Sequence, residues 1–115
     1  MMNQMMLVGR ITRDPEVNEV GDEKKVSNIT LAVQRPFKNA EGEYETDFID
    51  VTLWNSIATN TAEYCHKGDL VGVKGRLQVD SYENEEGNKV SKMNVIADKI
   101  TFLASRQHEE PETAR

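Results

Sequence analysis

Apolar and polar residues alternate with a period of two over three stretches of this chain, which is the pattern of strands with one face in a core. The stretches cover residues 26–37, 47–54 and 70–82. Because Pro36 cannot donate to a strand ladder, we expect regular pairing of the first stretch to stop there. In the last stretch we expect four residues to point inward: Val71, Val73, Leu77 and Val79.

Two further strands are predicted at the ends of the domain. Residues 4–11 are almost continuously apolar, as in a strand that is covered on both faces. Residues 90–103 read as a last strand or a bent pair of strands. The polar stretches before 47–54 and before 90–103 each contain a glycine and are expected to be hairpin tips.

A single short helix is predicted between residues 55 and 69, where the apolar period lengthens to that of a helix. Asn55 or Ser56 can serve as its N-cap. We expect Lys67 in the last turn and Gly68 at a left-handed C-cap.

Three strands, one helix and two strands, in that order, predict an all-β fold. The layout is that of an OB-fold, a five-stranded Greek-key barrel with one short helix between strands 3 and 4. A β-meander packed against one helix fits the same order of elements. We expect one domain over residues 1–105 and a short, polar, disordered tail over residues 106–115.

Composition limits where the protein works. No apolar run approaches the roughly 20 residues of a membrane-spanning helix, and the N-terminus has no signal-peptide pattern. Cys65 is the only cysteine, so no internal disulfide can form, which favours a reducing, cytoplasmic setting.

Two aromatic residues lie on the polar side of the strand that precedes the helix. Ile49, Val51 and Leu53 take the core side, so Phe48 and Trp54 are expected to face water. Either ring alone could be ordinary packing under a loop. The presence of both rings on one face favours a binding role.

Cations and further rings accompany this pair. On the stretch 70–82 the outward set is Lys74, Arg76, Gln78 and Tyr82, with Asp80 the exception. Arg35, Phe37 and Lys38 flank Pro36, while Lys89 and Lys92 follow the second hairpin. Rings stack on bases and cations meet phosphates, so this pattern suits a single-stranded nucleic acid. For the cations alone, the simpler interpretation is a solvated charged face.

The net charge of the chain argues against nucleic-acid binding. The chain carries 14 Lys and Arg against 20 Asp and Glu, which gives −6 at pH 7, whereas a nucleic-acid binder usually has a basic footprint. Since exposed charges are screened over roughly 8 Å at physiological salt, the local face matters more than the total.

Catalysis and metal binding find no support in the residues. Asp47 and Asp50 lie on opposite faces of one strand and cannot form an acid–base pair. His66 and His108 are the only histidines, and no spacing brings together the three or four ligands of a metal site. We therefore expect no enzyme activity, no metal and no cofactor.

Four long blocks resemble the bacterial single-stranded DNA-binding protein family, over about residues 3–103. The blocks are NQMMLVGRITRDPE, ITLAVQRPFKNAEGEYETDFIDVTLW, AEYCHKGDLVGVKGRLQ and SYENEEGNKV. The resemblance implies an OB-fold, sequence-independent binding of single-stranded DNA in replication, recombination and repair, and a cytoplasmic, nucleoid-associated location. It also implies a homotetramer, a dimer of dimers formed through the N-terminal strand.

The same resemblance implies stacking roles for four aromatic residues: Phe37, Phe48, Trp54 and Tyr82. With the polar residues placed above, and Arg10 of the first strand, the expected contact set is completed by Arg10, Arg35, Lys38, Lys74, Arg76, Gln78, Lys89 and Lys92.

Departures from the family pattern predict weaker phosphate contact. Members often carry basic residues where this chain has Asp80 and the pair Asn55 and Ser56, and the first hairpin is acidic. A shallower salt response should follow. The family's flexible linker and acidic tip ending in Pro and Phe are also missing, so recruitment of replication and repair proteins is expected to be impaired, as in a short paralogue or a truncated chain.

Two other classes remain open. An OB-fold can serve as a protein-interaction module of a primosome-like complex, where acidic charge is an advantage. A cold-shock-like module would bind RNA as well as DNA. Quenching of Trp54 fluorescence by oligo(dT) separates the first from a single-strand binder, and a comparison of poly(U) with poly(dT) separates the second.

Overall fold

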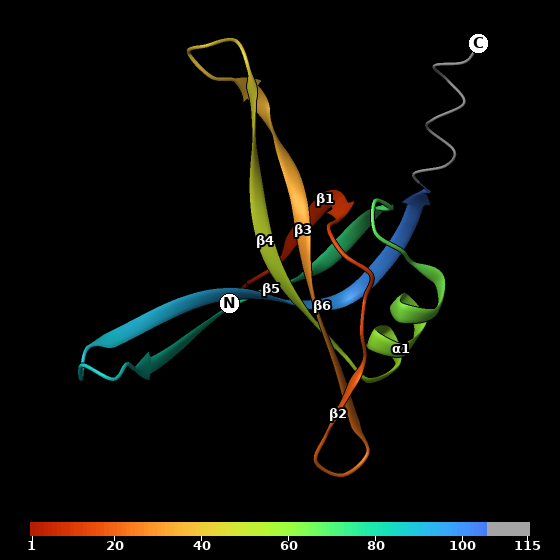
Figure 1. Cartoon of the computed structure of the whole chain (residues 1–115), viewed down its shortest axis with the longest axis vertical. Helices are drawn as coiled ribbons and strands as arrows, with labels where there is room; N and C mark the ends of the chain where they lie inside the picture. The colour runs from red at the N-terminus through yellow and green to blue at the C-terminus, as the bar shows by residue number, and fades with distance from the viewer. Residues whose placement is uncertain (106–115) are drawn as a thin grey trace.

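The computed structural model describes residues 1–105, which form six strands and one helix (Figure 1). In chain order the elements are β1 (Met5–Ile11), β2 (Asn18–Val20), β3 (Lys24–Lys38), β4 (Tyr44–Trp54), α1 (Asn55–Tyr64), β5 (Leu70–Glu83) and β6 (Lys89–Ala104). The expected tail of residues 106–115 lies outside the described residues.

Five of these strands close into a barrel. The sheet order is β1-β5-β6-β4-β3-β2, and an additional pairing of β1 with β3 joins the two sides of the barrel. This closure uses only the pairs of Arg10 with Ala32 and of Ile11 with Leu31. β4 runs parallel to β6, whereas the other pairs are antiparallel. The predicted all-β OB-fold, with its helix between the third and fourth barrel strands, is confirmed.

β2 is the one strand that the apolar pattern did not predict. Its three residues are all exposed and pair with the start of β3 from Lys24 to Val26. Such a short polar hairpin strand has no buried face, so it leaves no alternation in the sequence.

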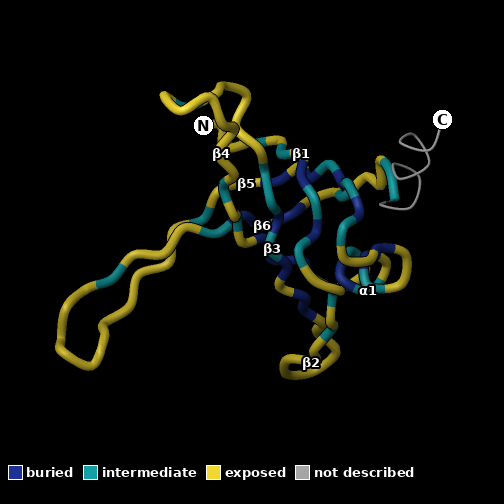
Figure 2. Tube along the Cα trace, turned by 45° about the horizontal axis from the view of Figure 1, so that its top comes forward, coloured by how far each residue is buried: buried dark blue, intermediate teal, exposed yellow. Residues whose placement is uncertain are grey.

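The core lies inside the barrel and under α1. Figure 2 shows the buried positions gathered there, whereas the hairpins that leave the barrel are exposed. Alternate residues of the barrel strands supply most of its side chains, and α1 adds Ala58. The fully buried group comprises Ile11, Ile29, Leu31, Val51, Leu53, Val71, Val73 and Val95.

Two hairpins extend beyond this core. The β3–β4 arm and the β5–β6 arm leave the barrel in different directions (Figure 1). The prediction that Leu77 and Val79 point into the core is therefore wrong, because their exposed fractions are 36% and 54%. They keep the parity of buried Val71 and Val73, but their part of β5 has already passed the barrel.

The helix ends earlier than predicted. It stops at Tyr64, and Cys65 returns to extended backbone, so Lys67 lies in a loop. Two carboxylates hold that loop: Asp69 accepts from the backbone N–H of His66, and Asp14 from that of Lys67. Those two N–H groups are bonded to side chains instead of to helical carbonyls, so the turn cannot continue as helix.

Gly68 has the predicted left-handed backbone, with φ 93°, but it lies within this loop, whereas the helix C-cap is Cys65. The helix N-cap position is Trp54, without a side-chain capping bond, rather than the predicted Asn55 or Ser56. Among residues 1–105, no helix has the length and apolar character needed to cross a membrane.

A β-bulge shapes the face of the barrel where β5 meets β6. Gly75 pairs with Ala97 and Lys74 pairs with Lys99, so Asp98 is an extra residue of β6. At this point the two backbones approach so closely that a Cβ on Gly75 would overlap the carbonyl oxygen of Ile96. The bulge and the glycine therefore belong together.

We expect Gly75→Ala to destabilise the domain by about 1–3 kcal/mol, because the barrel wall must shift to admit the methyl group. Gly72→Ala is the matched control in the same strand, since a Cβ there meets only Leu103 Cδ1 at 3.8 Å. Its effect should stay within about 0.5 kcal/mol. Urea unfolding at one fixed protein concentration measures both, and equal losses would contradict the proposed backbone overlap.

Candidate nucleic-acid interface

The outer face of β4 presents two aromatic rings to water. Phe48 is 69% exposed and Trp54 is 39% exposed, whereas Val51 and Leu53 are fully buried. The parity predicted for this strand is confirmed. Phe48 and Trp54 are six positions apart along the extended strand, which puts their Cα atoms roughly 20 Å apart at about 3.3 Å per residue and leaves room for more than one nucleotide between them.

Trp54 is held at the point where the strand turns into the helix. Asn55 adopts φ 53°, a left-handed conformation that asparagine tolerates better than most residues. Its side-chain Oδ1 accepts a hydrogen bond from the backbone N–H of Lys25 at 3.1 Å. Trp54 also pairs with Val26 of β3, so its backbone is held from two sides, while the residue stays 39% exposed.

A row of amide and hydroxyl groups crosses the face between the two rings. Asn94 Nδ2 donates to Thr52 Oγ1 at 2.6 Å, and Thr52 Oγ1 donates to Asn28 Oδ1 at 3.0 Å. The three residues come from β6, β4 and β3, so the row ties together the strands on which a ligand would lie. It also explains why Thr52 is buried although it has outward parity.

Beside this row lies a hollow of about 290 Å³, lined mainly by polar side chains. Asp50 accepts from Thr30 Oγ1 at 3.0 Å, and its other oxygen lies 3.8 Å from Lys92 Nζ. Lys92 is also the cross-strand neighbour of Asp80. The cation therefore stands between two carboxylates, and this part of the face is not basic.

Unpaired positive charge is concentrated on β5 and β6 instead. Lys74 and Lys99 are direct cross-strand neighbours, and no ion pair joins either of them to a carboxylate of residues 1–105. Like charges directly opposite one another repel. Arg76 follows on the same face and donates only to Gln78 Oε1, at 3.0 Å. An anion placed here would relieve the repulsion.

Lys99 is a residue that the sequence interpretation missed. In an unbroken strand it would share the inward parity of Val95 and Ala97. The extra residue at Asp98 turns Lys99 outward. A bulge of this kind leaves no reliable mark in a single sequence, apart from the glycine that its partner strand requires.

Arg10 reaches the outer face from β1. It pairs with Ala32, and Ala32 pairs in turn with Phe48, so the three residues form one cross-strand row. The guanidinium Nη1 donates to the carbonyl oxygen of Gly68 at 2.9 Å. The structure thus places Arg10 in the same cross-strand row as Phe48, two strands away, and its guanidinium holds the loop after α1.

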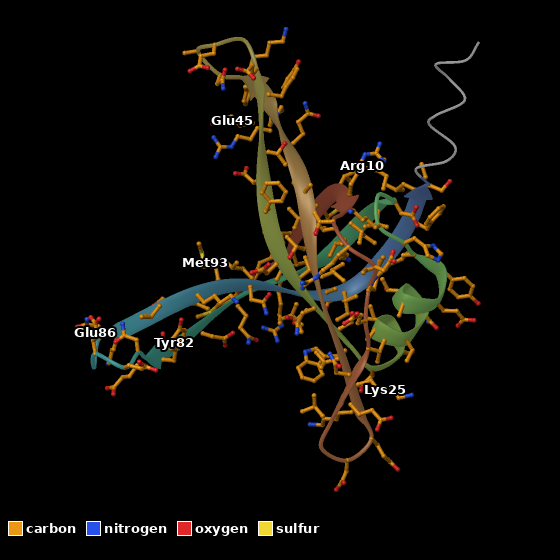
Figure 3. All side chains as sticks on the ribbon, in the orientation of Figure 1. Arg10, Lys25, Glu45, Tyr82, Glu86 and Met93 are labelled. Atoms are coloured by element: carbon orange, nitrogen blue, oxygen red, sulfur yellow. The ribbon has the colours of Figure 1, made fainter. Side chains whose placement is uncertain are left out.

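The β5–β6 arm carries the remaining predicted residues away from the barrel (Figure 3). Tyr82 is 54% exposed and pairs with Val90 near the hairpin tip. Lys89 pairs with Glu83, which reduces the positive charge there. Gln78, nearer the barrel, donates to Asp80 Oδ1. A ligand must therefore leave the barrel to reach Tyr82.

The β3–β4 arm presents Phe37, which is 79% exposed. Lys38 pairs with Tyr44 near the tip, and its ammonium lies 5.7 Å from the centre of that ring. Phe37 and Lys38 lie at the opposite end of the β3–β4 ladder from Trp54, which pairs with Val26. The structure thus places Phe48 and Trp54 on the outer face of β4 and Lys74, Lys99 and Arg76 on the outer face of β5 and β6, and it displays Phe37 and Tyr82 on separate arms.

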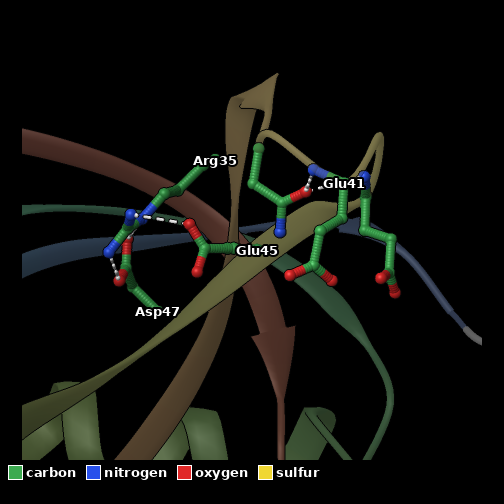
Figure 4. Close-up of polar contacts among 6 residues, drawn as sticks. Arg35, Glu41, Glu45 and Asp47 are labelled. Atoms are coloured by element: carbon green, nitrogen blue, oxygen red, sulfur yellow. Dashed lines mark hydrogen bonds and ion pairs between the residues drawn. The ribbon is translucent and has the colours of Figure 1, made fainter.

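Arg35 is the predicted contact residue whose surroundings differ most from expectation. Its Nε and Nη2 donate to the two oxygens of Asp47, both at 3.0 Å, and its Nη1 donates to Glu45 Oε2 at 3.1 Å (Figure 4). Because Asp47 and Phe48 are consecutive in β4, their side chains leave opposite faces of the arm. The guanidinium lies with Asp47, away from Phe48.

A closed β-barrel with exposed rings and cations along its outer wall defines the class of OB-fold proteins that hold single-stranded nucleic acids. The chain belongs to the single-strand binding protein family, whose model matches residues 2–103.

Relatives of this chain agree with that assignment. It is 51% identical over 109 residues to single-stranded DNA-binding protein B of Bacillus subtilis, covering 95% of this chain and 96% of that protein. It is 48% identical over 106 residues to the single-stranded DNA-binding protein of Halalkalibacterium halodurans, covering 92% of this chain and 63% of that protein. Single-stranded DNA-binding protein 1 of Staphylococcus aureus (strain Mu50) is 50% identical over 103 residues, 90% of this chain and 66% of that protein.

The Arg35 hydrogen bonds lower the pKa of the Asp47 carboxyl below its ordinary value. The stabilising ion pair is therefore complete at neutral pH and is lost as the pH falls through that lowered pKa. In an NMR titration we expect the midpoint of Asp47 to lie below about 3.9. Arg35→Gln should raise it toward the ordinary value, and Lys38→Gln should leave it in place. An unchanged midpoint in Arg35→Gln would contradict the pairing.

Proposed function

We propose that this protein binds and protects single-stranded DNA without regard to sequence, in replication, recombination and repair. One observation carries the proposal. Phe48 and Trp54 stand exposed on one wall of the barrel, and the repelling pair of Lys74 and Lys99 lies on neighbouring strands. Exposed rings offer stacking surfaces to bases, and the two lysines, which have no carboxylate partner among residues 1–105, offer contacts to phosphates.

The chemistry of binding follows from this arrangement. Bases stack on Phe48 and Trp54, and every base has the same kind of π-face, so stacking does not select a sequence. The phosphates between stacked bases meet Arg76 and the two lysines. Phe37 and Tyr82 extend the platform along the two arms. The acidic groups beside Lys92 limit the number of phosphate contacts, which fits a modest salt dependence.

The proposal includes no catalytic step, because binding and release of DNA need no bond making. The rival function, a protein-interaction module of a primosome-like complex, would use the acidic charge and could bury the same rings against a protein. It differs in its prediction that oligo(dT) leaves the fluorescence of Trp54 almost unchanged. A cold-shock-like RNA function would use the same rings. It differs in its prediction of equal affinity for poly(U) and poly(dT).

We further infer that the protein assembles as a homotetramer, a dimer of dimers. β1 pairs with β5 along its length but with β3 only at Arg10 and Ile11, so among residues 1–105 its second edge has no partner strand from residue 5 to residue 9. Free strand edges pair readily with another chain. Met6 and Val8, exposed by 79% and 54%, add an apolar surface beside that edge.

Location and partners are proposed from the family. The protein works in the cytoplasm with the nucleoid, where single strands arise during replication and repair. Replication and repair proteins are its expected neighbours.

We expect Trp54→Ala and Phe48→Ala each to weaken oligo(dT) binding by about 1–3 kcal/mol, the usual worth of one stacked base. Because Trp54 is the only tryptophan, its fluorescence reports the contact directly and should be quenched on binding. Tyr64→Ala removes a ring of α1 that is also exposed, by 67%, and should bind like the parent. Binding without quenching, or equal losses in all three variants, would refute the stacking model.

We expect sedimentation at micromolar concentration to show a particle of four 13.0-kDa chains. Val8→Lys should reduce its size, because it places a charge beside the free edge of β1. Val20→Lys, at an exposed valine of β2, should leave the tetramer intact. A parent protein that sediments as a monomer would exclude the proposed assembly.

A further inference from the structure

The β3–β4 arm contains an irregular segment that carries Phe37. Gln34 pairs with Thr46 and Lys38 pairs with Tyr44, so three residues of β3 stand opposite Glu45 alone. One of the three is Pro36, which has no backbone N–H to donate. The ladder therefore does not fix the direction of Phe37.

The parts of the arm on either side of this segment are ordered by other contacts. Toward the barrel, β3 and β4 pair without interruption from Val26 to Gln34. At the tip, Asn39 Oδ1 accepts hydrogen bonds from the backbone N–H groups of Glu41 and Glu43. The irregular segment is thus a potential hinge between two rigid pieces, and motion at this hinge would move Phe37.

Arg35 lies in this segment and bridges it to β4. The guanidinium makes three hydrogen bonds to Asp47 and Glu45, two of them a parallel pair to one carboxylate (Figure 4). Such a fork restricts orientation as well as distance, which a single point charge cannot do. The bridge replaces the missing ladder bonds on the side of the arm opposite Phe48.

We propose that Arg35 is a positioning residue for Phe37 and does not itself contact phosphate. The ion-pair cluster of Arg35, Glu45 and Asp47 has a net charge of −1, so it offers an approaching strand no positive charge. All three side chains are about half exposed, so the cluster is held by its geometry rather than by burial. This inference rests on the proposed function, because it gives Phe37 a stacking role.

Asp47→Asn distinguishes the two roles of Arg35 by the sign of its effect. If Arg35 contacts phosphate, loss of the competing carboxylate frees it, and binding of oligo(dT) tightens. If Arg35 holds the hinge, the same variant loosens Phe37, and binding weakens although a negative charge has been removed. We expect Asp47→Asn to weaken oligo(dT) binding by at least about twofold. The loss should not exceed that of Phe37→Ala, which we expect to be roughly 5- to 150-fold.

Two further measurements support the assignment. Arg35→Gln should weaken binding while leaving the salt slope unchanged, whereas loss of a phosphate contact flattens it by about 0.7. In a Phe37→Ala background, Arg35→Gln should have no additional effect, because the ring that it positions is gone. Lys38→Gln removes the same charge from the same arm, and because Lys38 is an expected phosphate contact, this variant should flatten the slope, which Arg35→Gln should not do.

A measurement without DNA separates this proposal from the function on which it rests. In a Trp54→Phe protein, Phe37→Trp places the only indole on the hinge, and its anisotropy decay reports local motion. Asp47→Asn and Arg35→Gln should enlarge the fast component, and Lys38→Gln should not. Thermal unfolding of each variant checks that the barrel is intact.

The possible results separate failure of the positioning role from failure of the proposed function. Unchanged anisotropy in Asp47→Asn, or tighter DNA binding by it, overturns the positioning role. If the parent does not bind oligo(dT), the proposed function fails, and the anisotropy still decides whether Arg35 orders the hinge.

Discussion

The alternation of side chains along β4 is the constraint on which the rest of the structure depends. Val51 and Leu53 fill the barrel interior and pair with buried residues of β3, so β4 cannot rotate or slip by one residue without emptying the core. That same requirement turns Phe48 and Trp54 to the outside. The position of the exposed rings is therefore a consequence of core packing, and no separate interaction is needed to expose them.

Regular parts of the fold could be predicted because they repeat a simple pattern. The parity of Phe48 follows from that of its neighbours, and the order of strands and helix follows from the change of period. Irregular parts could not be predicted. The bulge at Asp98 reverses the parity of Lys99. The length of β5 beyond the barrel exposes Leu77, although Leu77 keeps the parity of the buried residues before it.

The cations show why charge must be located before it is counted. A chain with a net charge of −6 still presents Lys74 and Lys99 together without a counter-ion among its described residues. Conversely, Arg35 looks in the sequence like a phosphate contact beside Phe37, but two carboxylates of β4 surround it. Its partners are ten and twelve residues away across a hairpin, and only the folded arm brings them into reach.

The divergence of the two arms has a mechanical consequence. A ligand that touches Phe37, the barrel wall and Tyr82 must change direction more than once within a few nucleotides. A single strand is flexible enough to do so, whereas duplex DNA stays nearly straight over its persistence length of about 150 base pairs. If the proposed contacts with both arms are made together, the shape of the protein selects against the double helix because of the stiffness of the duplex, before any contact with an individual base.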